Sequence, residues 1–162
     1  MPHLCPCGYY GDRRRPCRCS PQQIRQYQSR ISGPLLDRID IHVEVASMQY
    51  REIAGKHPSE DSQTIRERIT RARTLQRKRF AGQGNFLNAR MSDRQLKTYC
   101  ALDEDSRKLI EMAVDKLGLS VRAYTRILKV ARTIADLEET AAICPPHVAE
   151  AIQYRNLDRR MI

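Results

Sequence analysis

The amino-acid sequence predicts a mainly α-helical protein, in which a C-terminal helical bundle follows a cysteine-rich loop, one helix and one strand of an incomplete α/β unit. Three observations predict this fold class. Apolar residues recur at helical spacing in several segments after residue 62. Four cysteines and two glycines crowd the stretch between Cys5 and Cys19. One segment, Leu35–Val45, has the period of a strand, and a single strand cannot form a sheet by itself.

These patterns divide the chain into three parts. Residues 1–47 carry the cysteine loop and the strand, residues 48–61 form a polar linker, and residues 62–162 form a helical domain. Because the strand needs partners, we interpret residues 1–47 as the remnant of an α/β core. We therefore expect the chain to be a C-terminal piece of a longer protein.

The N-terminal part is predicted to hold one short helix before the strand. Ser20-Pro21 is a helix-opening pair for a helix over 22–31, and Gly33-Pro34 ends it. In the next segment the β-branched residues Ile39, Ile41 and Val43 alternate with polar residues as far as Val45. This period of two predicts a half-buried strand with its apolar side chains inward.

Five helices are predicted after the linker. They cover 63–80, a short helix capped by Ser92 and ending at Cys100, 103–117 with Gly118 as its stop, 120 to about 138, and a last helix that Pro145-Pro146 starts. The first has Ile65, Ile69, Ala72 and Leu75 on one side. The fourth has the clearest core face, composed of Tyr124, Ile127, Leu128, Ala131, Ile134 and Ala135.

The charge balance favours an anionic partner. The chain has 29 Lys+Arg against 19 Asp+Glu, a formal net charge of +10. Such a balance attracts polyanions by steering and counterion release. No apolar run reaches the length of a membrane span and the first residues lack a secretory signal, so we expect a cytoplasmic protein with no membrane partner.

The cysteine cluster predicts a structural zinc site. Cys5, Cys7, Cys17 and Cys19 offer four soft ligands, which is what tetrahedral zinc prefers, and four thiolates leave no open position for a catalytic water. One residue separates the cysteines of each pair, fewer than the usual two to four, so free thiols and disulfides stay open as alternatives. Cys100 and Cys144 are interpreted as small core residues.

The sequence lacks the parts that grip nucleotide phosphates. A phosphate-binding loop needs glycine five residues before its Gly-Lys pair and a hydroxyl residue after it. Gly55-Lys56 instead has Tyr50 and His57 at these positions. An apolar strand ending in paired acids for the metal is missing as well, so the chain alone is not expected to hydrolyse ATP.

Two long stretches carry a resemblance to a known family. The run CPCGYYGDRRRPCRCSPQQIRQYQSRISGPLLDRIDIHVEV is similar to the magnesium-chelatase-like AAA+ ATPases of the competence-associated ComM type. LSVRAYTRILKVARTIADL (119–137) and HVAEAIQYRNLDR (147–159) resemble the helical lid of the same proteins. The resemblance implies a C-terminal lid preceded by the end of an AAA+ core, with ATP and Mg²⁺ as cofactors of the full-length protein.

The resemblance also implies roles for two arginines. Arg38, in LLDRID, matches the arginine finger that reaches into the ATP site of the neighbouring subunit. Arg122, in LSVRAY, matches the sensor arginine of the lid, which contacts the ATP of its own subunit. Full-length relatives are expected to form hexameric rings that drive branch migration of DNA during natural transformation.

Basic residues provide the remaining candidate sites. Arg13, Arg14, Arg15 and Arg18 on the cysteine loop are candidates for nucleic-acid binding, and the predicted helix over 63–80 is rich in arginine. A solvated or intersubunit face explains that helix equally well. Two alternative functions remain: a stand-alone zinc-stabilised nucleic-acid-binding module, and a magnesium-chelatase subunit that works on porphyrin.

Overall fold

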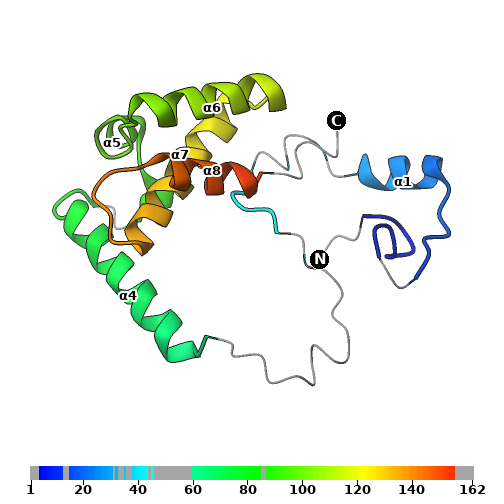
Figure 1. The fold of residues 1–162 in the computed structure, drawn as a ribbon, viewed down its shortest axis with the longest axis horizontal. Coiled ribbons are helices and arrows are strands. Elements are labelled where there is room, and N and C mark those ends of the chain that lie inside the picture. The colour runs from blue at the N-terminus through cyan, green and yellow to red at the C-terminus, as the bar shows by residue number, and fades with distance from the viewer. Residues whose placement is uncertain are drawn as a thin grey trace.

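The computed structural model describes residues 4–12, 15–30, 32, 35, 38–43, 45, 60–84 and 87–155. The bundle within this part of the chain comprises α4 (Ser62–Arg79), the 3₁₀ turn η1 (Asn88–Arg90), α5 (Asp93–Tyr99), α6 (Glu104–Leu117), α7 (Val121–Leu137) and α8 (Pro145–Gln153). Helix α1 (Pro21–Gln28) belongs to the N-terminal part. Figure 1 shows α4 to α8 gathered together, with α1 and the cysteine loop apart from them. The predicted mainly helical fold class is confirmed.

The helix ends follow the predicted caps. Ser20, Ser92, Asp103 and Ser120 each occupy an N-cap position, and each accepts a hydrogen bond from a backbone N–H of the first turn. These bonds satisfy donors that have no partner within the helix. Gly118 ends α6 in the left-handed conformation, with φ 59°, which a residue without Cβ adopts at little cost.

Helix α7 is the centre of the bundle. It packs against α8, α4, α5 and η1, while α6 packs on α8. Its buried apolar residues are Ala123, Ile127, Leu128, Ala131, Ile134 and Ala135. Five of the six predicted core residues are therefore confirmed. The sixth, Tyr124, is 36% exposed, because it lies where α6 and α7 diverge and lines the wall of an open groove.

Two further predictions about burial are wrong. The described residues of Leu35–Val45 form no strand, and Ile41, Val43 and Val45 are exposed while His42 is buried. A strand requires a hydrogen-bonded ladder, and the described part of the chain offers this segment no neighbouring strand. In α4, Ile65 and Ile69 are exposed rather than buried, since every residue from 60 to 71 lies at the surface.

A buried polar network joins α4 to α7. Asp136 is fully buried, and its carboxylate accepts hydrogen bonds from both Nη atoms of Arg79, from Arg132 Nε (3.1 Å) and from Asn88 Nδ2 (2.7 Å). The Arg132 guanidinium also donates to the carbonyls of Thr140 (2.6 Å) and Ala141 (2.8 Å) after α7. Buried charges are tolerated when paired and hydrogen-bonded in this way.

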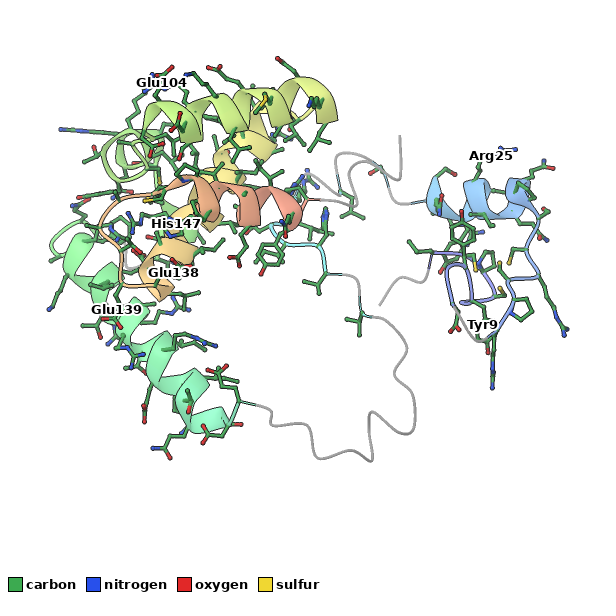
Figure 2. All side chains as sticks on the ribbon, viewed as in Figure 1. Tyr9, Arg25, Glu104, Glu138, Glu139 and His147 are labelled. Atoms are coloured by element: carbon green, nitrogen blue, oxygen red, sulfur yellow. The ribbon has the colours of Figure 1, made fainter. Side chains whose placement is uncertain are left out.

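A side-chain contact joins the end of α7 to the start of α8. The ring of His147, near the start of α8, lies 2.8 Å from a carboxylate oxygen of Glu138. Figure 2 shows these two residues together with Glu139 at the end of α7. No helix among the described residues is both long and apolar enough to cross a membrane.

Candidate functional site

The cysteine loop brings its four predicted ligands together. The sulfur atoms of Cys5, Cys7, Cys17 and Cys19 all lie within 4.8 Å of one another. Neighbouring sulfurs are separated by 3.4 Å (Cys5–Cys7), 3.5 Å (Cys7–Cys17) and 3.7 Å (Cys5–Cys17). Four thiolates around one zinc ion would stand about 3.8 Å apart, given a Zn–S bond of about 2.3 Å. The quartet therefore fits a tetrahedral metal.

The loop backbone prepares this quartet. Gly8 and Gly11 adopt φ values of 81° and 85°, and these left-handed turns fold the loop between the two cysteine pairs. The Tyr10 N–H donates to Cys5 Sγ at 3.3 Å. Backbone N–H groups of Tyr9 and Arg18 lower the pKa of Cys7 to about 6, which favours a thiolate at neutral pH.

The neighbouring thiol behaves in the opposite way. The pKa of Cys17 is raised to about 12: the backbone of Cys19 lowers it, but desolvation and hydrogen bonds from the other thiols outweigh that effect. Ionisation of one thiol thus opposes ionisation of its neighbour. A bound cation would remove this opposition by stabilising both thiolates. All six cysteines are free, so the disulfide alternative has no support in this geometry.

Metal analysis tests the zinc site directly. Reduced protein prepared with zinc is expected to carry about one tightly bound zinc ion per chain, measured by atomic emission, because four thiolates close the coordination shell. Replacing Cys7 and Cys17 by serine should abolish it. Cys144→Ser is the matched control, since Cys144 caps α8 outside the quartet and should leave zinc content unchanged. Absence of stoichiometric zinc from fresh reduced protein would refute the site.

The two remaining cysteines behave as structural residues. Cys100 belongs to the bundle core, and burial raises its pKa to about 11, so it stays a neutral thiol. Cys144 is half-buried at the start of α8. The prediction that they pack as small side chains is confirmed for Cys100.

The basic residues of the cysteine loop are partly described. Arg15 donates from Nη1 to Tyr9 Oη at 2.8 Å and stacks over the Tyr9 ring at 5.4 Å, so this pair stabilises the loop itself. Figure 2 shows Tyr9 at the edge of the loop. Arg18 is exposed, and Arg13 and Arg14 lie outside the described residues.

Both arginines with predicted phosphate roles are solvent-exposed. Arg38 follows a turn in which its N–H donates to the Leu35 carbonyl at 3.0 Å. Arg122 is the second residue of α7, two positions after the Ser120 cap. Among the described residues, no carboxylate is recorded as an ion-pair partner for either side chain. Both guanidinium groups are therefore available to an external anion.

A groove lies beside Arg122. It has a volume of about 380 Å³ and runs between the end of α6 and the start of α7, with Val114, Leu119 and Tyr124 among its apolar lining residues. Glu111 and Asp115 of α6 line it as well. Ser120 and Val121, which precede Arg122 in the chain, line this groove.

The segment that follows Arg38 is joined to the bundle by contacts that the sequence did not predict. Asp40 forms an ion pair with Arg126, one turn after Arg122 on α7. The buried Arg155 donates to the Ile39 carbonyl, and the His42 N–H donates to the Tyr154 carbonyl at 2.8 Å. We call these contacts of residues 39–42 the clasp.

Comparison with known proteins identifies the family. The sequence profile of the C-terminal part of magnesium chelatase subunit ChlI matches residues 59–155, and that of magnesium chelatase subunit ChlI matches residues 2–53. The chain belongs to the magnesium-chelatase-like family. The first profile covers the bundle of α4 to α8, and the second covers the cysteine loop and the segment of Arg38.

Related proteins place it close to a competence-associated branch of the family. Competence protein ComM of Haemophilus influenzae is 41% identical over 155 residues, which is 95% of this chain and 29% of the relative. Protein YifB is 40% identical over 159 residues in Salmonella typhimurium and 38% in Escherichia coli, covering 97% of this chain and 30% of each relative. The chain thus spans less than a third of the length of these relatives, and the resemblance to ComM-type proteins is confirmed.

Proposed function

We propose that this chain forms the C-terminal portion of a ring-forming AAA+ ATPase that acts on DNA, and that it supplies Arg38 and Arg122 to ATP sites. The observation that carries the proposal is a contrast among arginines. Arg79 and Arg132 both donate hydrogen bonds to the buried carboxylate of Asp136. Arg38 and Arg122 are exposed, and neither forms an ion pair with a carboxylate of the described residues. Arginines left open in this way can bind phosphate.

Arg38 suits a role in the active site of an adjacent subunit. A guanidinium stays charged at all physiological pH values and presents a planar fork of donors to phosphate oxygens. Stabilisation of charge on the transferring phosphoryl group is the chief contribution that a protein makes to such reactions. In the proposed hexameric ring, Arg38 would reach the neighbour's γ-phosphate.

Arg122 suits contact with the nucleotide of its own subunit. Its position at the start of α7 places it next to the helix N-terminus, where free N–H groups and the helix dipole favour negative charge. α4, α5, α8 and η1 also pack against α7. A phosphate held by Arg122 would therefore act on the whole lid domain.

The remaining parts of the ATP site belong to other polypeptide. The phosphate-binding loop and the acids that hold Mg²⁺ are absent from this sequence, so they would come from the segment that matches the rest of the relatives' length. Bound ATP with Mg²⁺ supplies the phosphoryl group and the metal that neutralises its charge. We infer that the chain by itself is inactive.

DNA is the proposed partner of the complete machine. The support is the name of one relative, competence protein ComM, together with the net charge of +10. The alternative function, a magnesium-chelatase subunit, would use the same ATP chemistry but would act on a porphyrin. The cysteine quartet and the basic balance favour DNA over porphyrin.

A chimera tests the proposed function. Residues 1–162 would replace the matching segment of Haemophilus influenzae ComM, and Mg²⁺-dependent phosphate release would be measured without DNA. Hydrolysis by the chimera and none by the 162-residue chain is the expected result, because the two arginines complete a site held elsewhere. A chimera that assembles into rings yet releases no phosphate would contradict the proposal and favour a stand-alone zinc-stabilised module.

A further inference from the structure

The structure sorts the six arginines of α4 into two groups. Arg68 pairs with Glu60 at 2.9 Å, Arg71 pairs with Glu139 at 2.6 Å, and Arg79 pairs with the buried Asp136. These three contacts hold the helix and attach it to α7. Three other arginines, Arg66, Arg73 and Arg77, have no such recorded partner among the described residues, and all three are exposed.

These three arginines share one side of α4. At about 100° per residue their directions fall within about 40° of one another, and they extend over about 16 Å of the helix axis. The buried residues Ala72 and Gln76 lie to one side of these arginines, about 60° to 140° away around the helix. We call Arg66, Arg73 and Arg77 the α4 stripe.

Nothing on the helix neutralises the α4 stripe. The positions three and four residues away from its members hold no acid; they include Gln63, Thr70 and a second stripe arginine. Glu67 lies to one side, and its carboxylate accepts a hydrogen bond from Gln63 at 3.1 Å. Arg73 and Arg77 are four residues apart, a like-charge spacing that destabilises a helix slightly. An external anion would offset that cost.

The chemistry of the α4 stripe indicates the class of partner. Thr70, at its centre, directs its hydroxyl to the Arg66 carbonyl at 2.8 Å. The exposed apolar residues beside the stripe, Ile65 and Ile69, are aliphatic, and they include none of the aromatic anchors on which protein interfaces are centred. Tyrosine and phenylalanine are absent from it, so it suits a phosphate backbone rather than stacked bases.

We propose that the α4 stripe binds the phosphate backbone of a nucleic acid. The inference deepens the proposed function, on which it rests, because it assigns the DNA contact to a named surface of the lid domain. It differs from the candidate residues of the cysteine loop. It also explains why the first half of α4, in which every residue is exposed, projects away from the bundle (Figure 1).

The test compares two triple variants of equal charge. One carries R66Q, R73Q and R77Q; the control carries R90Q, R94Q and K97Q, which removes three exposed cations near α5. Binding of the whole chain to a fluorescent single-stranded 30-mer would be measured by anisotropy across a salt series. The stripe variant is expected to lose at least about tenfold in affinity and to flatten the log–log salt slope by about 2, given about 0.7 per phosphate contact.

The outcomes separate the possible explanations. The control should lose less than about threefold, because its charges act only at a distance. Equal weakening in both variants, or no binding by the unmodified chain, would overturn the proposal. Salt-sensitive self-association that the stripe variant abolishes, without DNA binding, would assign the surface to an acidic neighbour and overturn it as well. Helical content by circular dichroism verifies folding.

The same variants separate this inference from the proposed function. In the chimera, the α4 stripe substitutions should leave DNA-free ATP hydrolysis unchanged. If the chimera hydrolyses ATP but the stripe substitutions leave the salt slope of DNA binding unchanged, only the DNA-binding role of the α4 stripe is rejected. If the unmodified chimera hydrolyses no ATP, the ATPase assignment is rejected.

Discussion

Replacing Arg38 by alanine in the ComM chimera is expected to lower the turnover number for ATP by about 10³-fold or more. An arginine that stabilises the transferring phosphoryl group is worth about 10³ to 10⁵ in turnover in well-studied phosphoryl-transfer sites. The KM for ATP should change little, since the finger acts on charge that develops during the reaction. Steady-state phosphate release at saturating ATP measures the effect.

Mixing subunits tests whether Arg38 acts across an interface. Chimera subunits carrying R38A would be combined with subunits whose phosphate-binding loop is disabled. Each population is inactive alone, yet mixed rings should recover a measurable fraction of activity, because an intact loop then faces an intact finger. Arg25→Ala, on exposed α1, is the control and should leave turnover unchanged. Failure to recover on mixing would place Arg38 outside its neighbour's site.

Replacing Asp136 by alanine is expected to destabilise the helical domain by about 3–5 kcal/mol. The substitution leaves the Arg79 and Arg132 guanidinium groups without their shared buried carboxylate, and removing one partner of a buried ion pair has this cost. Folded domains have a total free energy of unfolding of only about 5–15 kcal/mol. The variant should therefore unfold at much lower urea, followed by far-ultraviolet circular dichroism.

An exposed carboxylate provides the comparison. Glu139 pairs with Arg71, and both side chains are 54% exposed, so Glu139→Gln should cost less than about 1 kcal/mol. Asp136→Asn retains the shape and one acceptor and should fall between the two. An Asp136→Ala variant whose urea midpoint lies within experimental error of that of Glu139→Gln would show that the network contributes little to stability.

The helices were predictable because their signals are local. Ser92, Asp103 and Ser120 bond to N–H groups three residues ahead, so the start of each helix is written in adjacent positions. The cysteine quartet was also predicted, since its four ligands lie within one short loop. In both cases the residues that contact one another in space are also close in the sequence.

Contacts between distant positions were not predictable in this way. Arg79 and Asp136 are separated by 57 positions, and on a helix so rich in arginine nothing marks Arg79 as the buried one. The alternation of Ile39, Ile41 and Val43 predicted a strand, but the described residues of this segment form none, and of 38–43 only His42 is buried. In the clasp, the Tyr154 carbonyl accepts from the N–H of His42 itself, and Arg155 binds the Ile39 carbonyl three residues earlier.

The clasp has a mechanical consequence for the proposed ring. It ties the residues directly after Arg38 to Arg126 of α7 and to the end of α8, and Arg122 stands one turn before Arg126 on the same helix. A tilt of α7 that follows the loss of a phosphate from Arg122 would therefore displace Arg38 by the same rigid motion. The nucleotide state of each subunit would then be coupled to the ATP site of the next subunit around the ring.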